Sequence, residues 1–193
     1  MSRFFDSRTT RSPRAVATGR ANKAAGSTHE FWMSLQHAEA KRAGLLAHVE
    51  KNEPHSKIIG GRVMYSSAGV SDYTGTLAAG TRSTSFFVGR PQLSCLDGVT
   101  LAVEAKSTSA ARLARAEVKP RQSEHLDAVA RAGGLALLLV EFRGADPLRF
   151  AVPWAEVPWT KLRTADSVGA ADLGRWLVQP GGSYLSMFAT TLR

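Results

Sequence analysis

Glu104 and Lys106 stand two positions apart in an apolar segment, residues 99–106, whose alternating pattern predicts a β-strand. Side chains two residues apart on a strand share one face, so we expect the carboxylate and the ammonium side by side, opposite the apolar face. Such a pair can hold a divalent cation and orient or deprotonate a water molecule when a second carboxylate is near. Asp72, within the segment SDYTG at residues 71–75, is the candidate for that second carboxylate.

The order of these residues is similar to that in the metal-binding core of the PD-(D/E)xK nuclease superfamily, in which an Asp and a Glu/Asp-x-Lys occupy adjacent strands of one hairpin. More narrowly, an ordered set of segments resembles the RecU family of Holliday junction resolvases over about residues 26–160. The set comprises SDYTG at 71–75, EAKST at 104–108, Gln122 with Leu126, and GGLALLLVEF at 133–142. Glu-x-Lys alone is a common pattern, and the ordered set is the more specific feature.

The resemblance implies an α/β fold with a central mixed β-sheet flanked by helices, a restriction-endonuclease-like core. It implies a metal-dependent endonuclease that resolves Holliday junctions by paired nicks during DNA recombination, DNA repair or phage DNA processing. Two other classes stay open: a PD-(D/E)xK nuclease of restriction or repair type, and a DNA-binding protein that merely retains acidic residues. The expected partners are branched DNA, as a four-way junction, and a second copy of the chain, because symmetric nicking needs two sites at a fixed separation.

The same resemblance assigns roles around a metal ion. Asp72 and Glu104, with the Ala105 carbonyl, are expected to bind Mg²⁺, for which Mn²⁺ could substitute. Lys106 is expected to position or deprotonate the attacking water and to offset charge in the transition state.

Two further polar residues are placed near this site by the resemblance. Glu30 matches a helical acid that faces the metal through water, and its alternative role is a first-turn charge that suits the helix dipole. Gln122 matches a polar residue near the metal or the scissile phosphate. Its alternative role is a capping or surface amide.

The composition favours a polyanionic partner. The chain of 193 residues has 25 Lys and Arg against 16 Asp and Glu, a net charge of +9, which fits nucleic acid and also anionic lipid. Its longest apolar run, residues 135–140, falls short of the ~20 residues that span a bilayer, so we expect no membrane-spanning role. The lack of a hydrophobic signal region and the single cysteine, Cys95, lead us to expect a cytoplasmic protein.

Positive charge gathers in two segments. Residues 1–25 hold six cations against one acid and show no sustained periodicity, which predicts a disordered basic arm ahead of a nuclease domain at 26–193. A second cluster follows Lys106, where a bound DNA strand would pass. The alternatives are a solubilising tail and an ordinary solvated loop. The cations expected to contact DNA are Arg11, Arg14, Arg20, Lys23, Arg112, Arg115, Lys119 and Arg121.

A first helix is expected from Ser27 or Thr28 to about residue 50, with Ser27 and Glu30 forming a capping box. The five histidines are scattered along the chain without metal-ligand spacing, and they are expected at the surface or in contact with phosphate. The stripe expected to face the core is Phe31, Leu35, Ala38, Arg42 and Leu45.

The remaining elements follow from periodicity and turn residues. Strands are expected at residues 57–65, 70–77, 99–106, 135–142 and 147–152, and helices or turns at 121–131, 153–157 and 170–178. The 80–98 connection is long for the family and predicts a substitute loop, a dimer contact or an extra strand pair. The stretch before Asp72 is expected to be too short for the protruding stalk that RecU-type enzymes insert into a junction. Gly75 is expected to permit close approach of a phosphate or another backbone.

Overall fold

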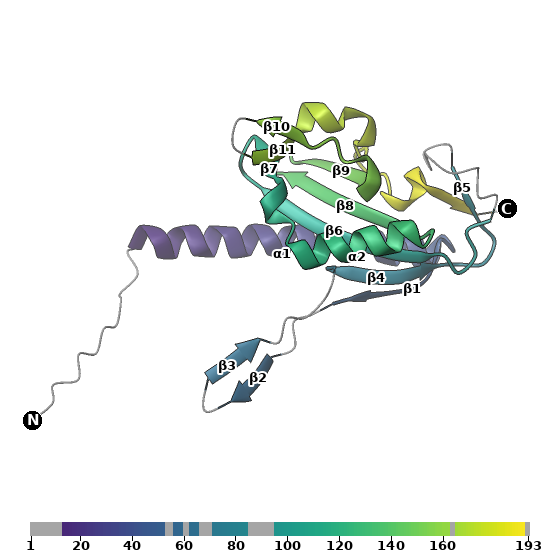
Figure 1. Ribbon diagram of the computed structural model, residues 1–193, viewed down its shortest axis with the longest axis horizontal. Coiled ribbons are helices and arrows are strands. Elements are labelled where there is room, and N and C mark those ends of the chain that lie inside the picture. Colours follow the sequence, from purple (N-terminus) through teal and green to yellow (C-terminus); the bar gives the residue numbers. More distant parts are fainter. Residues whose placement is uncertain are drawn as a thin grey trace, which may run out of the picture.

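Five strands form the central sheet of the protein. The structure, a computed structural model, describes residues 13–52, 56–59, 62–65, 71–84, 95–162 and 165–191. The strand order is β1-β4-β6-β8-β9 (Figure 1). The bounds are β1 Leu46–Lys51, β4 Tyr73–Leu77, β6 Thr100–Thr108, β8 Leu135–Phe142 and β9 Leu148–Pro153. β6 and β8 run parallel whereas the other neighbours are antiparallel, so the sheet is mixed.

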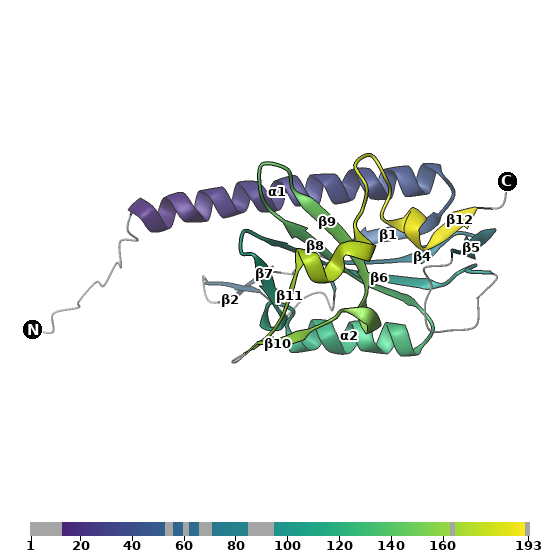
Figure 2. The same cartoon turned by 90° about the horizontal axis from the view of Figure 1, so that it is seen from above.

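Two helices cover this sheet from opposite sides. α1 (Pro13–Arg42) runs along one face and α2 (Pro120–Arg131) along the other (Figure 2). α2 has a proline at its first position, where no intrahelical hydrogen bond is lost, and it buries Leu126 and Val129. No helix in the described part of the chain is long and apolar enough to cross a membrane. The expected α/β fold, a mixed sheet between helices, is confirmed.

The core is centred on β8. This strand lies between β6 and β9 and is buried at every position. Its sequence, LALLLVEF, carries apolar residues in succession, as a strand covered on both faces requires. The strand predicted at 135–142 is therefore confirmed, and so are the strand at 99–106, as part of β6, and the helix at 121–131, as part of α2.

The buried face of α1 differs from the predicted one. Phe31 and Leu35, which belong to the predicted stripe, are 64% and 47% exposed. The residues that the helix buries instead are His29, Met33, Gln36, His37 and Ala40. A stripe chosen by apolar residues alone is wrong here, because three of the five side chains that α1 buries within residues 28–42, where burial is described, are polar.

These polar side chains are buried because they find partners inside the protein. Gln36 Oε1 accepts a hydrogen bond of 3.0 Å from the amide of Tyr184, and His37 Nε2 lies 2.7 Å from the Tyr184 hydroxyl. His29 lies 3.4 Å from Glu141 of β8. The expectation that all five histidines lie at the surface is wrong for His29 and His37.

The N-terminal bound of α1 also differs from the prediction. The helix begins at Pro13, so residues 13–25, which we expected in a disordered arm, are helical. Ser27 and Thr28 lie inside the helix, and the predicted capping box with Glu30 is wrong. Residues 1–12 lie outside the described residues.

The C-terminal bound of α1 comes earlier than predicted. The helix ends at Arg42, and Gly44, with a φ of 73°, turns the chain in the left-handed region that favours glycine. Residues 46–50, predicted as helix, instead belong to β1 and pair with β4. Pairing with a distant strand has overridden the local helical preference.

A separate hairpin lies between β1 and β4. β2 (Ser56–Ile59) and β3 (Arg62–Tyr65) pair in antiparallel fashion, where one strand was predicted over 57–65. Gly60 and Gly61, the predicted bulge, lie outside the described residues. Figure 1 shows the hairpin standing away from the sheet. The stretch before Asp72 thus holds a projecting hairpin, whereas we expected it to be too short for the stalk of RecU-type enzymes.

Smaller elements surround the sheet. β5 (Thr81–Ser83) lies at the start of the 80–98 connection and pairs with β12 (Ala189–Thr191), so its partner comes from a distant part of the chain and not from the connection itself. Phe86, Phe87 and Arg90 of that connection lie outside the described residues. A three-stranded sheet and four short 3-10 helices complete the fold: β7 (Arg112–Ala114), β11 (Ala165–Gly169), β10 (Thr160–Leu162), η1 (Arg115–Glu117), η2 (Trp154–Glu156), η3 (Ala170–Trp176) and η4 (Leu185–Met187).

Gly75 lies at a close backbone contact in β4. A Cβ added there would lie 2.3 Å from the His48 carbonyl oxygen and 3.0 Å from Val49 Cα. Of the two expectations for this glycine, the structure bears out the approach of another backbone, that of β1.

Candidate active site

The acid and the base of β6 lie together. Glu104 and Lys106 share one face of the strand, as predicted, and the Lys106 Nζ lies 2.6 Å from Glu104 Oε1. The side chain of Glu104 is fully buried and that of Lys106 is 18% exposed. The contact is an ion pair, and the Asp72 backbone also hydrogen-bonds to this carboxylate, which offers about four acceptor positions in all. This buried carboxylate therefore has unused acceptor capacity.

Asp72 completes the group from the neighbouring strand. It immediately precedes β4, whose first residue pairs with Val103 of β6, and so it arrives beside residues 104 and 105. Asp72 Oδ2 accepts a hydrogen bond of 2.9 Å from the Ala105 amide. The strand predicted at 70–77 is shorter than expected, and Asp72 lies just outside it. The predicted meeting of Asp72 with the Glu-x-Lys segment is nevertheless what the structure contains.

The two carboxylates make the site unfavourable for negative charge. Burial raises the pKa of Glu104 to about 7, the charge of Asp72 adds to the rise, and the Lys106 ammonium opposes it. A carboxyl group with such a pKa, beside a partner of like charge, is typical of functional sites.

The donor set suits a hard cation. Among the described residues no three His, Cys, Asp or Glu side chains come together as a metal-binding group. The protein ligands would thus be two carboxylates with the Ala105 carbonyl, and water would complete the shell, as Mg²⁺ commonly keeps it. The burial of Glu104 and its closeness to a second acid, which together raise its pKa, are what a bound cation would relieve. The residues present therefore fit the ion.

Glu30 has a direct partner on β1. Its Oε2 accepts a hydrogen bond of 2.9 Å from Lys51 Nζ, and both side chains are largely exposed. The structure thus places Glu30 in a surface ion pair. Its water-mediated role at the metal stays a prediction.

Gln122 caps α2. Its Oε1 accepts a hydrogen bond of 2.9 Å from the backbone amide of Lys119, at the N-terminus of the helix. Of the two expectations for Gln122, the structure bears out the capping amide. A role near the scissile phosphate stays a prediction.

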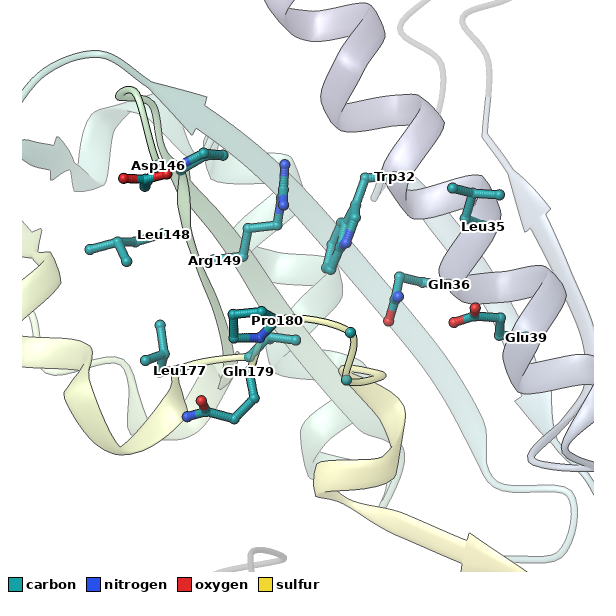
Figure 3. Close-up of a pocket in the computed structure, with 14 residues that line it drawn as sticks. Trp32, Leu35, Gln36, Glu39, Asp146, Leu148, Arg149, Leu177, Gln179 and Pro180 are labelled. Carbon is teal, nitrogen blue, oxygen red and sulfur yellow. The ribbon is translucent and has the colours of Figure 1, made fainter.

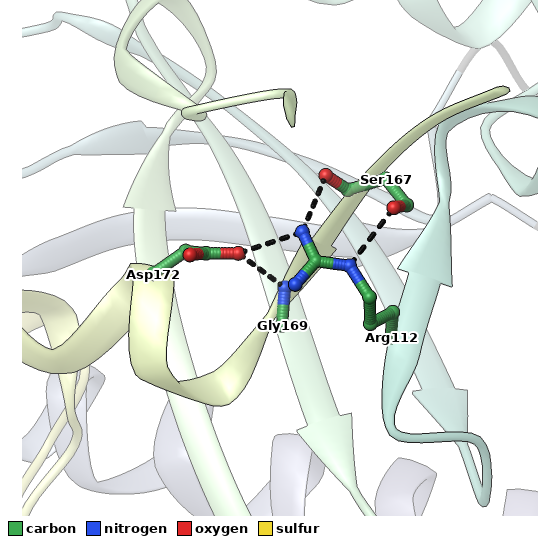
Figure 4. A network of polar contacts seen from close by, with 4 residues as sticks. All are labelled: Arg112, Ser167, Gly169 and Asp172. Carbon is green, nitrogen blue, oxygen red and sulfur yellow. Dashed lines mark hydrogen bonds and ion pairs between the residues drawn. The ribbon is translucent and has the colours of Figure 1, made fainter. Parts of the chain in front are cut away.

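The cations after Lys106 fall into two kinds. Arg112 is held by the fold: Nε donates to Ser167 Oγ at 2.9 Å, and Nη2 donates to Asp172 Oδ2 at 2.8 Å and to the Ser167 carbonyl (Figure 4). Asp172 also accepts from the Gly169 amide, so this network ties β7 to β11 and η3. The hydrogen bonds of Arg112 therefore hold β7, β11 and η3 together.

Arg115 differs from Arg112 in its surroundings. It is exposed, and its guanidinium carbon lies 5.7 Å from the centroid of the Trp159 ring, a cation–π contact. Lys119 is also exposed. Arg11 lies outside the described residues. DNA contacts by Arg14, Arg20, Lys23 and Arg121 stay predictions.

A buried ionic cluster on the other face of the sheet was not predicted. Glu141 of β8 is buried and interacts with Ser107 of β6, Arg149 of β9 and His29 of α1. A glutamate within an otherwise apolar strand is a signal that could have revealed it, because a buried carboxylate requires partners.

A cavity lies on the α1 face. It has a volume of about 570 Å³ and is lined by Trp32 and Leu35 of α1, by Leu148 and Arg149 of β9, and by Pro180 (Figure 3). Arg149 pairs with Glu141, which lies beside Ser107, and Ser107 points to the face opposite Glu104. This mostly apolar groove is therefore separate from the group of Asp72, Glu104 and Lys106.

No protein-family model and no curated protein matches this sequence. Among solved structures, the chain is similar to Hjc of Archaeoglobus fulgidus, a Holliday junction resolvase from an archaeal hyperthermophile. The two share 16% sequence identity, and the match covers 76% of this chain and 91% of Hjc with a TM-score of 0.41.

Proposed function

We propose that this chain is a metal-dependent DNA endonuclease that resolves Holliday junctions by paired nicks. The observation that supports the proposal most is Glu104, a fully buried carboxylate beside a second acid, Asp72, with the ammonium of Lys106 2.6 Å away. Structural carboxylates are normally satisfied by hydrogen bonds, and Glu141 in the same sheet is an example. Two acids that lie together at a buried position, with Lys106 as the neighbouring cation, are better explained by a metal ion that binds there.

Each residue of the group has a part in phosphodiester hydrolysis. Asp72, Glu104 and the Ala105 carbonyl would hold Mg²⁺ or Mn²⁺. The ion, when bound, would supply charge stabilisation at the phosphate and lower the pKa of a water molecule. Lys106, with its ammonium partly exposed, would orient the attacking water and offset negative charge that develops in the transition state. The Ala105 amide keeps Asp72 in place through their hydrogen bond.

Nucleic acid is the proposed partner because of the charge of the protein. The chain carries a net charge of +9, and Arg115 and Lys119 are exposed shortly after the end of β6. The Trp159 ring holds the guanidinium of Arg115 in position, which lowers the entropy lost when it binds a phosphate. Both side chains are suited to neutralise the backbone of a strand near Lys106.

Branched DNA and a homodimer follow from the resemblance of about residues 26–160 to RecU-type resolvases. Two symmetric nicks need two sites, which a two-fold dimer supplies. The projecting hairpin of β2 and β3 is the element that would enter the centre of a junction, as the stalk does in those enzymes.

Cleavage of labelled DNA tests the proposal. A four-way junction, a linear duplex, a flap and a single strand are each incubated with the protein in Mg²⁺ and in EDTA. We expect paired cuts in the four-way junction in Mg²⁺ and none in EDTA. Cleavage of linear duplex as fast as the junction would assign a nuclease of another specificity. Binding without cleavage of any substrate would contradict nuclease activity altogether.

A further inference from the structure

A charged cluster is buried between four elements of the fold. Glu141 Oε1 accepts a hydrogen bond of 2.9 Å from Ser107 Oγ of β6. Glu141 Oε2 accepts from Arg149 of β9, at 2.9 Å from Nε and 2.8 Å from Nη2. His29 Nδ1 of α1 lies 3.4 Å from the same oxygen. The cluster therefore joins β6, β8, β9 and α1 through one carboxylate.

Stability alone does not account for this cluster. Burial raises the pKa of Glu141, but the neighbouring His29 and the hydrogen bonds from Ser107 and Arg149 outweigh it and lower the pKa to about 2. The carboxylate is thus charged under all ordinary conditions. Replacing a buried ion pair by well-packed apolar residues is often neutral or stabilising, and the rest of β8 is apolar. Fixing a particular geometry is the function that such a cluster serves better than an apolar core.

The geometry in question is that of the second half of β6. The ladder between β4 and β6 ends at the pair Tyr73–Val103, whereas the ladder between β6 and β8 continues to Thr108 and Phe142. Glu104 and Lys106 therefore lie in the part of β6 that pairs, among the described strands, with β8 alone. A strand held on one side twists and bends more easily than one held on both.

Ser107 lies in this one-sided part of β6, next to Lys106. Because neighbouring side chains point to opposite faces, Lys106 points to the acidic site while Ser107 points to Glu141. The hydrogen bond from Ser107 to Glu141 therefore adds a side-chain contact to the backbone ladder between β6 and β8, on the face behind the site. The contact of His29 with Glu141 joins α1 to the same cluster, at the position just before Glu30.

We propose that Ser107 and Glu141 are positioning residues that fix the direction of the Lys106 side chain from the opposite face of the sheet. This inference rests on the proposed nuclease function of Glu104 and Lys106. Reactive groups must be held to within a fraction of an ångström, so a strand that can rotate about its axis would cost activity even though every metal ligand is still present.

Three variants test this tie. Ser107→Ala removes the hydroxyl donor, and Ser107→Thr retains it. Tyr184→Phe is the matched control, because it removes another buried hydroxyl that bonds to α1, at His37, away from β6. For each protein, amide hydrogen exchange of a peptide that contains residues 104–108 is measured by mass spectrometry, together with the single-turnover rate on saturating four-way junction in Mg²⁺ and the melting temperature.

We expect Ser107→Ala to speed exchange at residues 104–108 and to lower the single-turnover rate about tenfold or more, with DNA binding unchanged. Ser107→Thr should restore both. Tyr184→Phe should lower the melting temperature but alter neither the exchange of this peptide nor the rate. Unchanged exchange in Ser107→Ala would overturn the proposed tie, and faster exchange with a normal rate would overturn its effect on Lys106. If the unaltered protein cleaves no DNA, the nuclease function fails, while the exchange measurement still decides whether Ser107 anchors β6.

Discussion

Replacing Glu104 by glutamine should stabilise the protein while removing its proposed activity. In the absence of metal, the folded protein must bury an ionised Glu104 beside Asp72, with Lys106 as its partially compensating neighbour. Glu104→Gln keeps the size and shape of the side chain and removes the charge. Functional sites commonly hold charges in positions that lower the stability of the folded protein. A substitution that removes such a charge then raises the free energy of unfolding.

The magnitude follows from the pKa of the carboxyl group. A rise from 4.5 to about 7 on folding corresponds to about 3 kcal/mol of stability that is present below pH 4.5 and lost as the pH rises through 7. The glutamine variant has no such loss. In EDTA, we therefore expect the two proteins to have equal free energies of unfolding near pH 4.5. The variant should gain steadily up to pH 7 and be about 3 kcal/mol more stable at pH 8.

Urea unfolding, followed by tryptophan fluorescence at several pH values in EDTA, measures this difference. Asp97→Asn is the control, because Asp97 also accepts a backbone hydrogen bond, from the Gly80 amide at 2.7 Å, but lies at an exposed position. It should show no gain at pH 8. Mg²⁺ should raise the melting temperature of the unaltered protein and leave that of Glu104→Gln unchanged. A glutamine variant that is no more stable than the unaltered protein at pH 8 would refute the reasoning from burial.

Three further outcomes are expected. Lys106→Ala should slow single-turnover cleavage about 100-fold or more, and it should weaken Mg²⁺ binding, measured by calorimetry, less than the loss of Asp72 or Glu104 does. Cleavage at the normal rate would mean that the Glu-x-Lys pattern arose by coincidence. Burial, with the nearby Lys41 charge, lowers the pKa of His37 to about 4, so up to about 3 kcal/mol of stability present above pH 6.5 should be lost as the pH falls towards 4. Urea unfolding of the unaltered protein and of His37→Gln at several pH values measures this loss. If the free energies of unfolding of the two proteins fall in parallel as the pH falls, the role of His37 is contradicted. Arg115→Gln should flatten the slope of log affinity for DNA against log salt by about 0.9, because one phosphate is no longer neutralised. Arg112→Gln breaks the ion pair with Asp172, so it should lower the melting temperature and leave this slope unchanged. If a binding titration shows a flatter slope for Arg112→Gln and an unchanged slope for Arg115→Gln, then Arg112 is the residue that contacts DNA.

The placement of Glu104 and Lys106 could be predicted because strand alternation is a local property. The two share a face whenever residues 99–106 form a strand, whatever lies around them. The arrival of Asp72 beside Ala105 is different, since it depends on the pairing of β4 with β6. Only the resemblance to a known family gave that contact in advance.

The buried face of α1 could not be predicted from apolar residues. Gln36 and His37 are buried because Tyr184, more than 140 positions later in the chain, supplies both of them with partners. The helix end differs from the prediction for a similar reason, because residues 46–51 are drawn into the sheet by β4. Long-range partners of this kind leave no mark in the local pattern.

The cluster around Glu141 does leave a mark in the sequence. A glutamate at the seventh position of LALLLVEF interrupts a strand that is buried throughout. Such a residue requires cationic or hydroxyl partners, although the sequence does not say which ones. Ser107, Arg149 and His29 become its partners only through the order of the strands and the position of α1.

The most direct test of the nuclease proposal is cleavage of a labelled four-way junction by Asp72→Asn and Glu104→Gln beside Asp97→Asn. The proposal predicts that both site variants bind the junction normally in EDTA but fail to cut it in Mg²⁺, since each loses a charged metal ligand with little change in volume. Asp97→Asn should bind and cut like the unaltered protein. Cleavage at the normal rate by Asp72→Asn or Glu104→Gln would contradict the assignment of the site.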